Sequence, residues 1–123
     1  MLTPDPCSRD EVMIEDTKHD PVVLTVFRSR LRLGAENKYR KMAAEMEARA
    51  RTMPGLVSFK SFAADDGERV SIVVFDSWST HRAWRDDPDH LLAQGLGRTQ
   101  FYEQYDITVC EVARQRVFPE RTG

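Results

Sequence analysis

The sequence predicts an α+β fold in which four antiparallel strands carry their helices on one face, in the ferredoxin-like order β-α-β-β-α-β. Three observations predict it. Four segments are rich in β-branched and aromatic residues, and a long segment between the first two has apolar residues at helical spacing. Asp65-Asp66-Gly67 marks a hairpin between the second and third strands. The predicted domain covers residues 21–113, with an N-terminal arm or flexible tail (1–20) and a C-terminal tail (114–123).

The first predicted strand, residues 22–31, is apolar on both faces over its first half. One face begins with Val22, Leu24 and Val26, so strand alternation turns Arg28 the same way. An arginine that continues an apolar face marks the rim of a sheet, or else it needs an anionic partner. We expect Arg28 at the rim and keep it as a candidate cation for a ligand.

A long amphipathic helix follows Gly34 and ends at Pro54-Gly55. Its apolar stripe recurs at steps of three and four residues and comprises Tyr39, Met42, Ala43, Met46, Ala50 and Met53. We expect Met42 and Met46 to be core residues and not part of a ligand site. Met46→Ala should then cost about 2–5 kcal/mol of stability.

The second half of the chain supplies the remaining elements. Residues 56–64 and 69–77 form the two strands of the hairpin, and the nearly continuous apolar character of the latter indicates a central strand. Ser77 can cap a short helix from Trp78 to Asp86, and Asp87-Pro88 opens a second helix that runs to about Tyr102. Residues 103–113 close the domain as a strand.

The composition excludes several classes of protein. Of the 123 residues, 41% are hydrophobic and 31% charged, and a net charge of -2 gives no basic surface for nucleic acid. No apolar run predicts a membrane span or a signal peptide, so we expect a cytoplasmic protein. Cys7 and Cys110 predict neither a disulfide framework nor a zinc site. Phosphate-binding loops, nucleophile elbows and metal-spaced clusters are not found in the sequence.

Strands that are apolar on both faces need cover on both sides of the sheet. Helices on one face leave the other side exposed to water, which is unfavourable for a large apolar surface. A second copy of the chain is the simplest cover, so we expect a homodimer.

The stretch WSTHRAWRDDPDH, residues 78–90, contains both tryptophans and two of the three histidines. On a helix, Trp78, His81, Trp84 and Arg85 form one broad face. Two interpretations remain open: the face packs on the sheet as core, or it lines a site with His81 as a catalytic base. We expect Trp84 to line a pocket and Trp78 to be a packing residue.

The last helix adds a second group of candidates. His90 and Gln94 can face the same way as Phe101, with Arg98 and Tyr105 nearby. Aromatic residues here are more often core than substrate walls. Arg98 is either a surface ion-pair partner or a cation for a phenolate or carboxylate.

Four segments carry a family resemblance: MPGLVSFKSF, VVFDSWSTHRAW, PDHLLAQ and FYEQYDITVCEV. Together they resemble the antibiotic biosynthesis monooxygenase family of dimeric α/β barrels, over about residues 21–113. The resemblance implies a small monooxygenase without cofactor or metal, which oxidises an electron-rich phenol, hydroquinone or polyketide-type aromatic with O₂. By that resemblance His81 or His90 is the base and Gln94 lies beside the substrate. The other implied substrate-binding residues are Arg28, Arg85 and Arg98 as cations and Trp84, Phe101 and Tyr105 as walls.

The sequence departs from the family pattern at two places. Phe75 stands where members often have Trp, and Trp84 stands where many quinol monooxygenases have His. Trp84 also resembles a tryptophan of the haem-degrading branch, but Gln94 replaces the axial histidine of that branch, which removes its iron bond. Two alternatives therefore remain open: a non-redox binding, cyclase or isomerase module for an aromatic ligand, and a haem-binding or haem-degrading protein.

Overall fold

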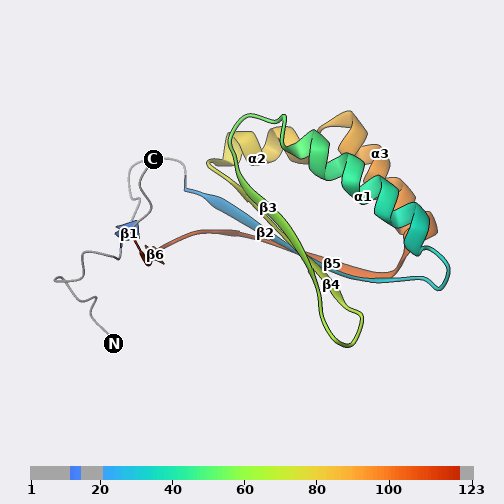
Figure 1. Ribbon diagram of the computed structural model, residues 1–123. Coiled ribbons are helices and arrows are strands. Elements are labelled where there is room, and N and C mark those ends of the chain that lie inside the picture. The colour runs from blue at the N-terminus through green and yellow to red at the C-terminus, as the bar shows by residue number, and fades with distance from the viewer. Residues whose placement is uncertain (1–11, 15–20, 120–123) are drawn as a thin grey trace.

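The computed structural model describes residues 12–14 and 21–119. Four antiparallel strands form the main sheet in the order β3-β4-β2-β5: β2 (Val23–Leu31), β3 (Leu56–Ala63), β4 (Arg69–Phe75) and β5 (Tyr102–Glu111). The helices α1 (Glu36–Ala50), α2 (Trp78–Arg85) and α3 (Pro88–Leu96) all lie on one face of this sheet (Figure 1). The predicted ferredoxin-like α+β fold is confirmed.

The turn and cap residues read from the sequence take the expected roles. Gly67 has a φ of +90° in the β3–β4 hairpin, a conformation that favours glycine. The Ser77 hydroxyl accepts a hydrogen bond from the Thr80 N–H at 3.2 Å, and the Asp87 carboxylate accepts one from the His90 N–H at 3.1 Å. Each bond satisfies a backbone donor in the first turn of its helix.

The last helix is shorter than predicted. It ends at Leu96 and continues as a π-helical turn, η1 (Gly97–Phe101), so that the strand begins at Tyr102. A side chain at Gly97 would meet the ring of Tyr102, which explains the glycine at this crowded site. Arg32 donates hydrogen bonds to the carbonyls of Arg98, Thr99 and Tyr102 and so holds the turn in place. Sequence periodicity gave no sign of the π turn.

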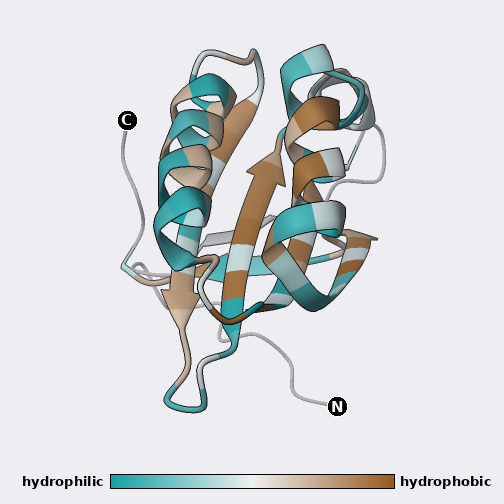
Figure 2. Cartoon of the chain, turned by 90° about the vertical axis from the view of Figure 1, so that its right-hand side faces the viewer, coloured by the Kyte–Doolittle hydropathy of each residue, from teal (hydrophilic) through white to brown (hydrophobic). Residues whose placement is uncertain are grey.

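The core between helices and sheet consists of two clusters. The first contains Ala50, Val73, Phe75 and Trp84, and the second contains Ala35, Tyr39 and Phe101. Figure 2 shows α1 beside the row formed by α2 and α3, with hydrophobic strand residues visible between the two rows. The helices thus cover the sheet as two separate rows.

The other face of the sheet is apolar as well. Leu24 and Val26 on β2 and Val70, Ile72 and Val74 on β4 alternate with the residues that face the helices. Within the described residues, no helix packs on this face (Figure 1).

The segments predicted as tails each contribute a short strand. β1 (Val12–Ile14) pairs antiparallel with β6 (Gln115–Val117) as a separate two-stranded sheet. Residues 115–117 of the predicted C-terminal tail thus form a strand, which the sequence analysis did not predict. A three-residue strand is too short for a recognisable alternation, and its partner lies at the far end of the sequence.

Cys110 is an exposed free thiol, whereas Cys7 lies outside the described residues. None of the helices in the described ranges is both long and apolar enough to cross a membrane.

Candidate functional site

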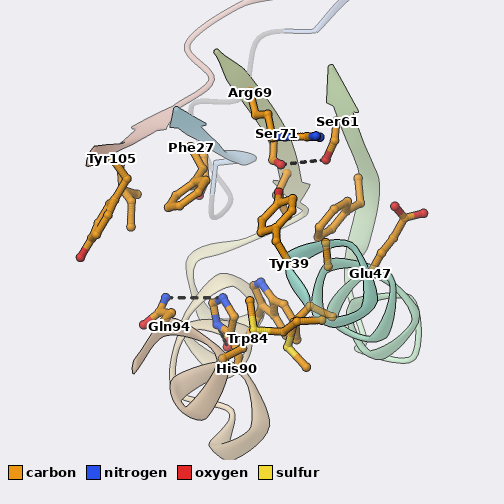
Figure 3. Close-up of a pocket in the computed structure, with 18 of the residues that line it drawn as sticks. Phe27, Tyr39, Glu47, Ser61, Arg69, Ser71, Trp84, His90, Gln94 and Tyr105 are labelled. Atoms are coloured by element: carbon orange, nitrogen blue, oxygen red, sulfur yellow. Dashed lines mark hydrogen bonds between the residues drawn. The ribbon is translucent and has the colours of Figure 1, made fainter. Parts of the chain in front are cut away.

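A cavity of about 560 Å³ lies between the helices and the sheet. Small-molecule sites typically have volumes of about 300–1,000 Å³ and mainly apolar walls with a few polar groups. Figure 3 shows such a set, with strand side chains facing α1 and α3 across the space. The candidate residues that line the cavity are His81, Trp84, Arg85, His90, Gln94, Arg98 and Tyr105.

Arg28 and Phe101 do not line this cavity. Arg28 lies at the rim on the opposite face of the sheet, where it is half exposed and pairs with Glu68 at 2.9 Å. Phe101 is 5% exposed and packs in the core with Ala35 and Tyr39. The π turn breaks the helical periodicity that predicted Phe101 on the same side as His90. Arg28 thus lies at the rim with an anionic partner, as expected, and neither residue lines the cavity that the other candidates share.

Trp84 belongs both to the core and to the wall of the cavity. It is 6% exposed and packs with Val73 and Phe75, yet it also lines the cavity. Its indole stacks on the imidazole of His90, with ring centroids 4.1 Å apart and planes 14° apart. The two interpretations of Trp84, core or wall, are thus not exclusive.

Hydrogen bonding fixes the tautomer of His90. Its Nδ1 lies 2.9 Å from the carbonyl oxygen of Trp84, which can only accept, so Nδ1 carries the proton in the neutral ring. Nε2 is then the basic nitrogen, and it faces the amide nitrogen of Gln94 at 3.4 Å (Figure 3). Burial lowers the pKa of His90 below its usual value and favours the neutral form. A neutral imidazole with Nε2 as its basic nitrogen can act as a general base once a substrate displaces the Gln94 amide from that nitrogen.

His81 also lines the cavity but is held differently. Its ring makes T-shaped contacts with the rings of Phe75 and Trp78, at centroid distances of 6.5 and 5.4 Å. No hydrogen bond to its ring nitrogens occurs among the residues described, so no contact selects its tautomer. Burial lowers the pKa of His81, and the positive charges of Arg85 and Arg82 add to the effect. His81 is therefore the less well oriented of the two histidines.

The two arginines of the cavity differ in their partners. Arg85 donates to the carboxylate of Asp86 at 2.9 Å, which occupies much of its hydrogen-bonding capacity. For Arg98, no ion pair forms with any carboxylate in the described part of the chain. Arg98 is thus the cation available to an anionic ligand. Trp78, by contrast, donates from Nε1 to Glu111 at 2.6 Å and does not line the cavity.

Two methionines of α1 belong both to the core and to the cavity wall. Met42 and Met46 are half-buried, each packs against a core cluster as expected, and each also lines the cavity, which was not expected. The apolar stripe of α1 does face the sheet, as predicted. Periodicity indicates which face of a helix turns inward, but not whether side chains fill the space in front of it.

Polar groups on the sheet side were missed entirely. Ser61 and Ser71 lie opposite each other on β3 and β4, with hydroxyl oxygens 2.7 Å apart. Arg69 lies over the ring of Tyr39 at 5.2 Å and bonds the Glu36 carboxylate at 3.2 Å. A serine inside an otherwise apolar strand was the available signal, because it places a hydroxyl on the covered face of the sheet.

Comparison with known proteins gives the family. No family model matches this sequence. The chain is 30% identical to YqjZ of Bacillus subtilis, an uncharacterized protein, over 110 residues that cover 89% of this chain and 96% of YqjZ. The chain belongs to the YqjZ family.

Solved structures give the fold of this YqjZ-family chain. SnoaB of Streptomyces nogalater, a cofactor-independent oxygenase, superposes with a TM-score of 0.65 at 19% identity, over 75% of this chain and 93% of SnoaB. A provisionally named antibiotic biosynthesis monooxygenase of Nitrosomonas europaea gives a TM-score of 0.67 at 9% identity, over 77% of this chain and 93% of its own length. The chain has the fold of the antibiotic biosynthesis monooxygenases, as the sequence resemblance predicted.

Proposed function

We propose that the chain is a monooxygenase that oxidises an electron-rich phenol with O₂ inside the cavity between helices and sheet. The observation that carries the proposal is His90, whose basic Nε2 is fixed by the Trp84 carbonyl and lies at the wall of an aromatic-lined cavity. The likeness in fold to SnoaB, a cofactor-independent oxygenase, supports the same chemistry.

The reaction begins with proton transfer from the phenol to Nε2 of His90. The phenolate then gives one electron to O₂, and the resulting superoxide and phenoxyl radical combine in a carbon–oxygen bond para to the oxygen. The peroxide takes the proton back from His90 and then loses water, which leaves the quinone, so that phenol and O₂ become quinone and water. A hydroquinone instead loses two electrons and two protons to O₂ and yields quinone and hydrogen peroxide.

Other groups in the cavity assist these steps. Arg98 stabilises the phenolate, because it has a free positive charge close to a partly water-excluded space. Trp84 and Tyr105 hold the rings of the substrate. Nε2 of His90 has a single lone pair, so the phenol O–H replaces the Gln94 amide N–H that lies 3.4 Å from it, and the displaced amide can then donate to the substrate oxygen. His81 serves as a second, less oriented base.

The chain also forms a homodimer in this proposal. The sheet face that carries Leu24, Val26, Val70, Ile72 and Val74 is apolar, and none of the described helices covers it. A second copy placed on this face would remove its apolar side chains from water.

An oxygen electrode tests the activity with protein that has been treated with a chelator. With 1,8-dihydroxyanthrone as substrate, we expect O₂ uptake that depends on protein and equals the quinone formed. His90→Gln should lower kcat by at least about a hundredfold, the usual contribution of a general base, while Trp78→Phe serves as a matched control and retains kcat.

Two other results would contradict the proposal. Binding of the probe without O₂ uptake would indicate a non-redox binding, cyclase or isomerase module. Uptake only after haem is added, with a Soret band on titration, would indicate a haem protein.

A further inference from the structure

The cavity has a second polar group, on the wall opposite His90. Ser61 on β3 and Ser71 on β4 occupy paired positions in adjacent strands, and both side chains face the helices. Figure 3 shows the pair on the sheet side, across the space from His90 and Gln94 on α3. Phe27, which pairs with Ser71 across β2 and β4, and Val73 on β4 add apolar side chains to the sheet wall beside the serines. A ligand that fills the cavity would meet a base on one side and two hydroxyls on the other.

One O–H donor of the serine pair is not used within the pair. Two hydroxyl groups contain two O–H donors, and the bond of 2.7 Å between their oxygens uses one of them. Neither hydroxyl has another partner among the described residues. The remaining O–H is therefore free to bond an acceptor in the cavity.

The neighbouring charges favour a neutral acceptor over an anion. Arg69 is the cation on the same face of β4, but the Glu36 carboxylate lies 3.2 Å away and balances its charge. The guanidinium also lies over the ring of Tyr39. Because no unpaired cation adjoins the serines among the described residues, a carboxylate would gain no ion pair there, whereas a neutral carbonyl needs only the O–H donor.

We propose that Ser61 and Ser71 are specificity-determining residues that bind a ketone or quinone carbonyl of the substrate. The substrate is then a fused-ring phenol with a carbonyl group remote from the hydroxyl that His90 deprotonates. This inference rests on the proposed function, because it takes the phenol oxidised by the protein as the ligand.

The test measures binding without turnover, by isothermal titration calorimetry in the absence of O₂. Three probes are compared: 2-naphthol, its 6-acetyl derivative, and 6-hydroxy-2-naphthoate. We expect the acetyl compound to bind about fivefold more tightly than 2-naphthol, as one net hydrogen bond allows, and the carboxylate to gain less. In Ser61→Ala/Ser71→Ala the acetyl preference should disappear while the Kd of 2-naphthol stays the same.

Ser58→Ala is the matched control, because Ser58 lies on the same strand but points to the other face of the sheet. It should keep the acetyl preference. Equal affinity of the wild type for 2-naphthol and its acetyl derivative would overturn the inference, as would no binding of any probe. An equal loss of affinity for both compounds in the double variant would also overturn it. The proposed oxidation can be refuted independently of the serine site. An acetyl preference without O₂ uptake would contradict the proposed function but still support carbonyl binding by the serines.

Discussion

Replacement of Trp84 by Phe should lower both stability and ligand affinity. A buried tryptophan removes about 150–250 Å² from water, and the smaller phenyl ring gives up roughly 40 Å² of that, or about 1 kcal/mol. The space left between Val73 and Phe75 adds a cavity penalty of similar size, because Trp84 is only 6% exposed. We expect a total loss of about 1–3 kcal/mol in a denaturant titration. Trp84 is thus more important for stability than a residue that only lines a pocket.

The same variant should bind 2-naphthol about threefold to tenfold more weakly, because an aromatic contact contributes about 0.5–1.5 kcal/mol. Loss of the stack on His90, with its centroid distance of 4.1 Å, adds to the effect by loosening the imidazole. Trp78→Phe is the matched control on the same helix: it removes a bond to Glu111 but no cavity wall. Wild-type affinity in Trp84→Phe would refute the reasoning and leave Trp84 as core alone.

Three further predictions follow from the fold and the cavity. Met46→Ala should cost less than about 2 kcal/mol in urea unfolding, because Met46 is only half-buried beside an open space; a loss of 3 kcal/mol or more would place it in a filled core. The free energy of unfolding should fall as the pH drops below about 6.5, because His81 and His90 stay neutral in the folded chain while the unfolded chain takes up protons. His90→Gln should reduce this pH dependence of the free energy of unfolding. The same pH dependence in wild type and variant would contradict a contribution from His90. Sedimentation at micromolar concentration should give twice 14.2 kDa, and a monomer would refute the dimer.

The sequence was sufficient for the fold because its local signals agree with one another. The hairpin glycine, the caps at Ser77 and Asp87, and the stripe of α1 each act within a few residues, and each fixes one element. The π turn could not be predicted in this way. It depends on Arg32, which lies some 66–70 residues from the carbonyls that it holds. Phe101 was misplaced for this reason.

The site was only partly predictable, for a related reason. Helical spacing correctly placed His81 with Trp84 and His90 with Gln94, because each pair lies within one helix. The sheet wall with Ser61, Ser71 and Arg69 depends on the pairing of β3 with β4 and on the space that α1 and α3 leave above it. That space is a property of packing, which residue patterns alone do not specify.

The pH dependence of kcat/KM for O₂-coupled phenol oxidation tests the central claim most directly, because it reports the base in the free enzyme. The wild type should lose activity only below about pH 6.5, since burial lowers the pKa of His90. His90→Gln should abolish most of the activity and remove this inflection, whereas His81→Gln should keep the inflection. A wild-type profile retained in His90→Gln would contradict His90 as the base.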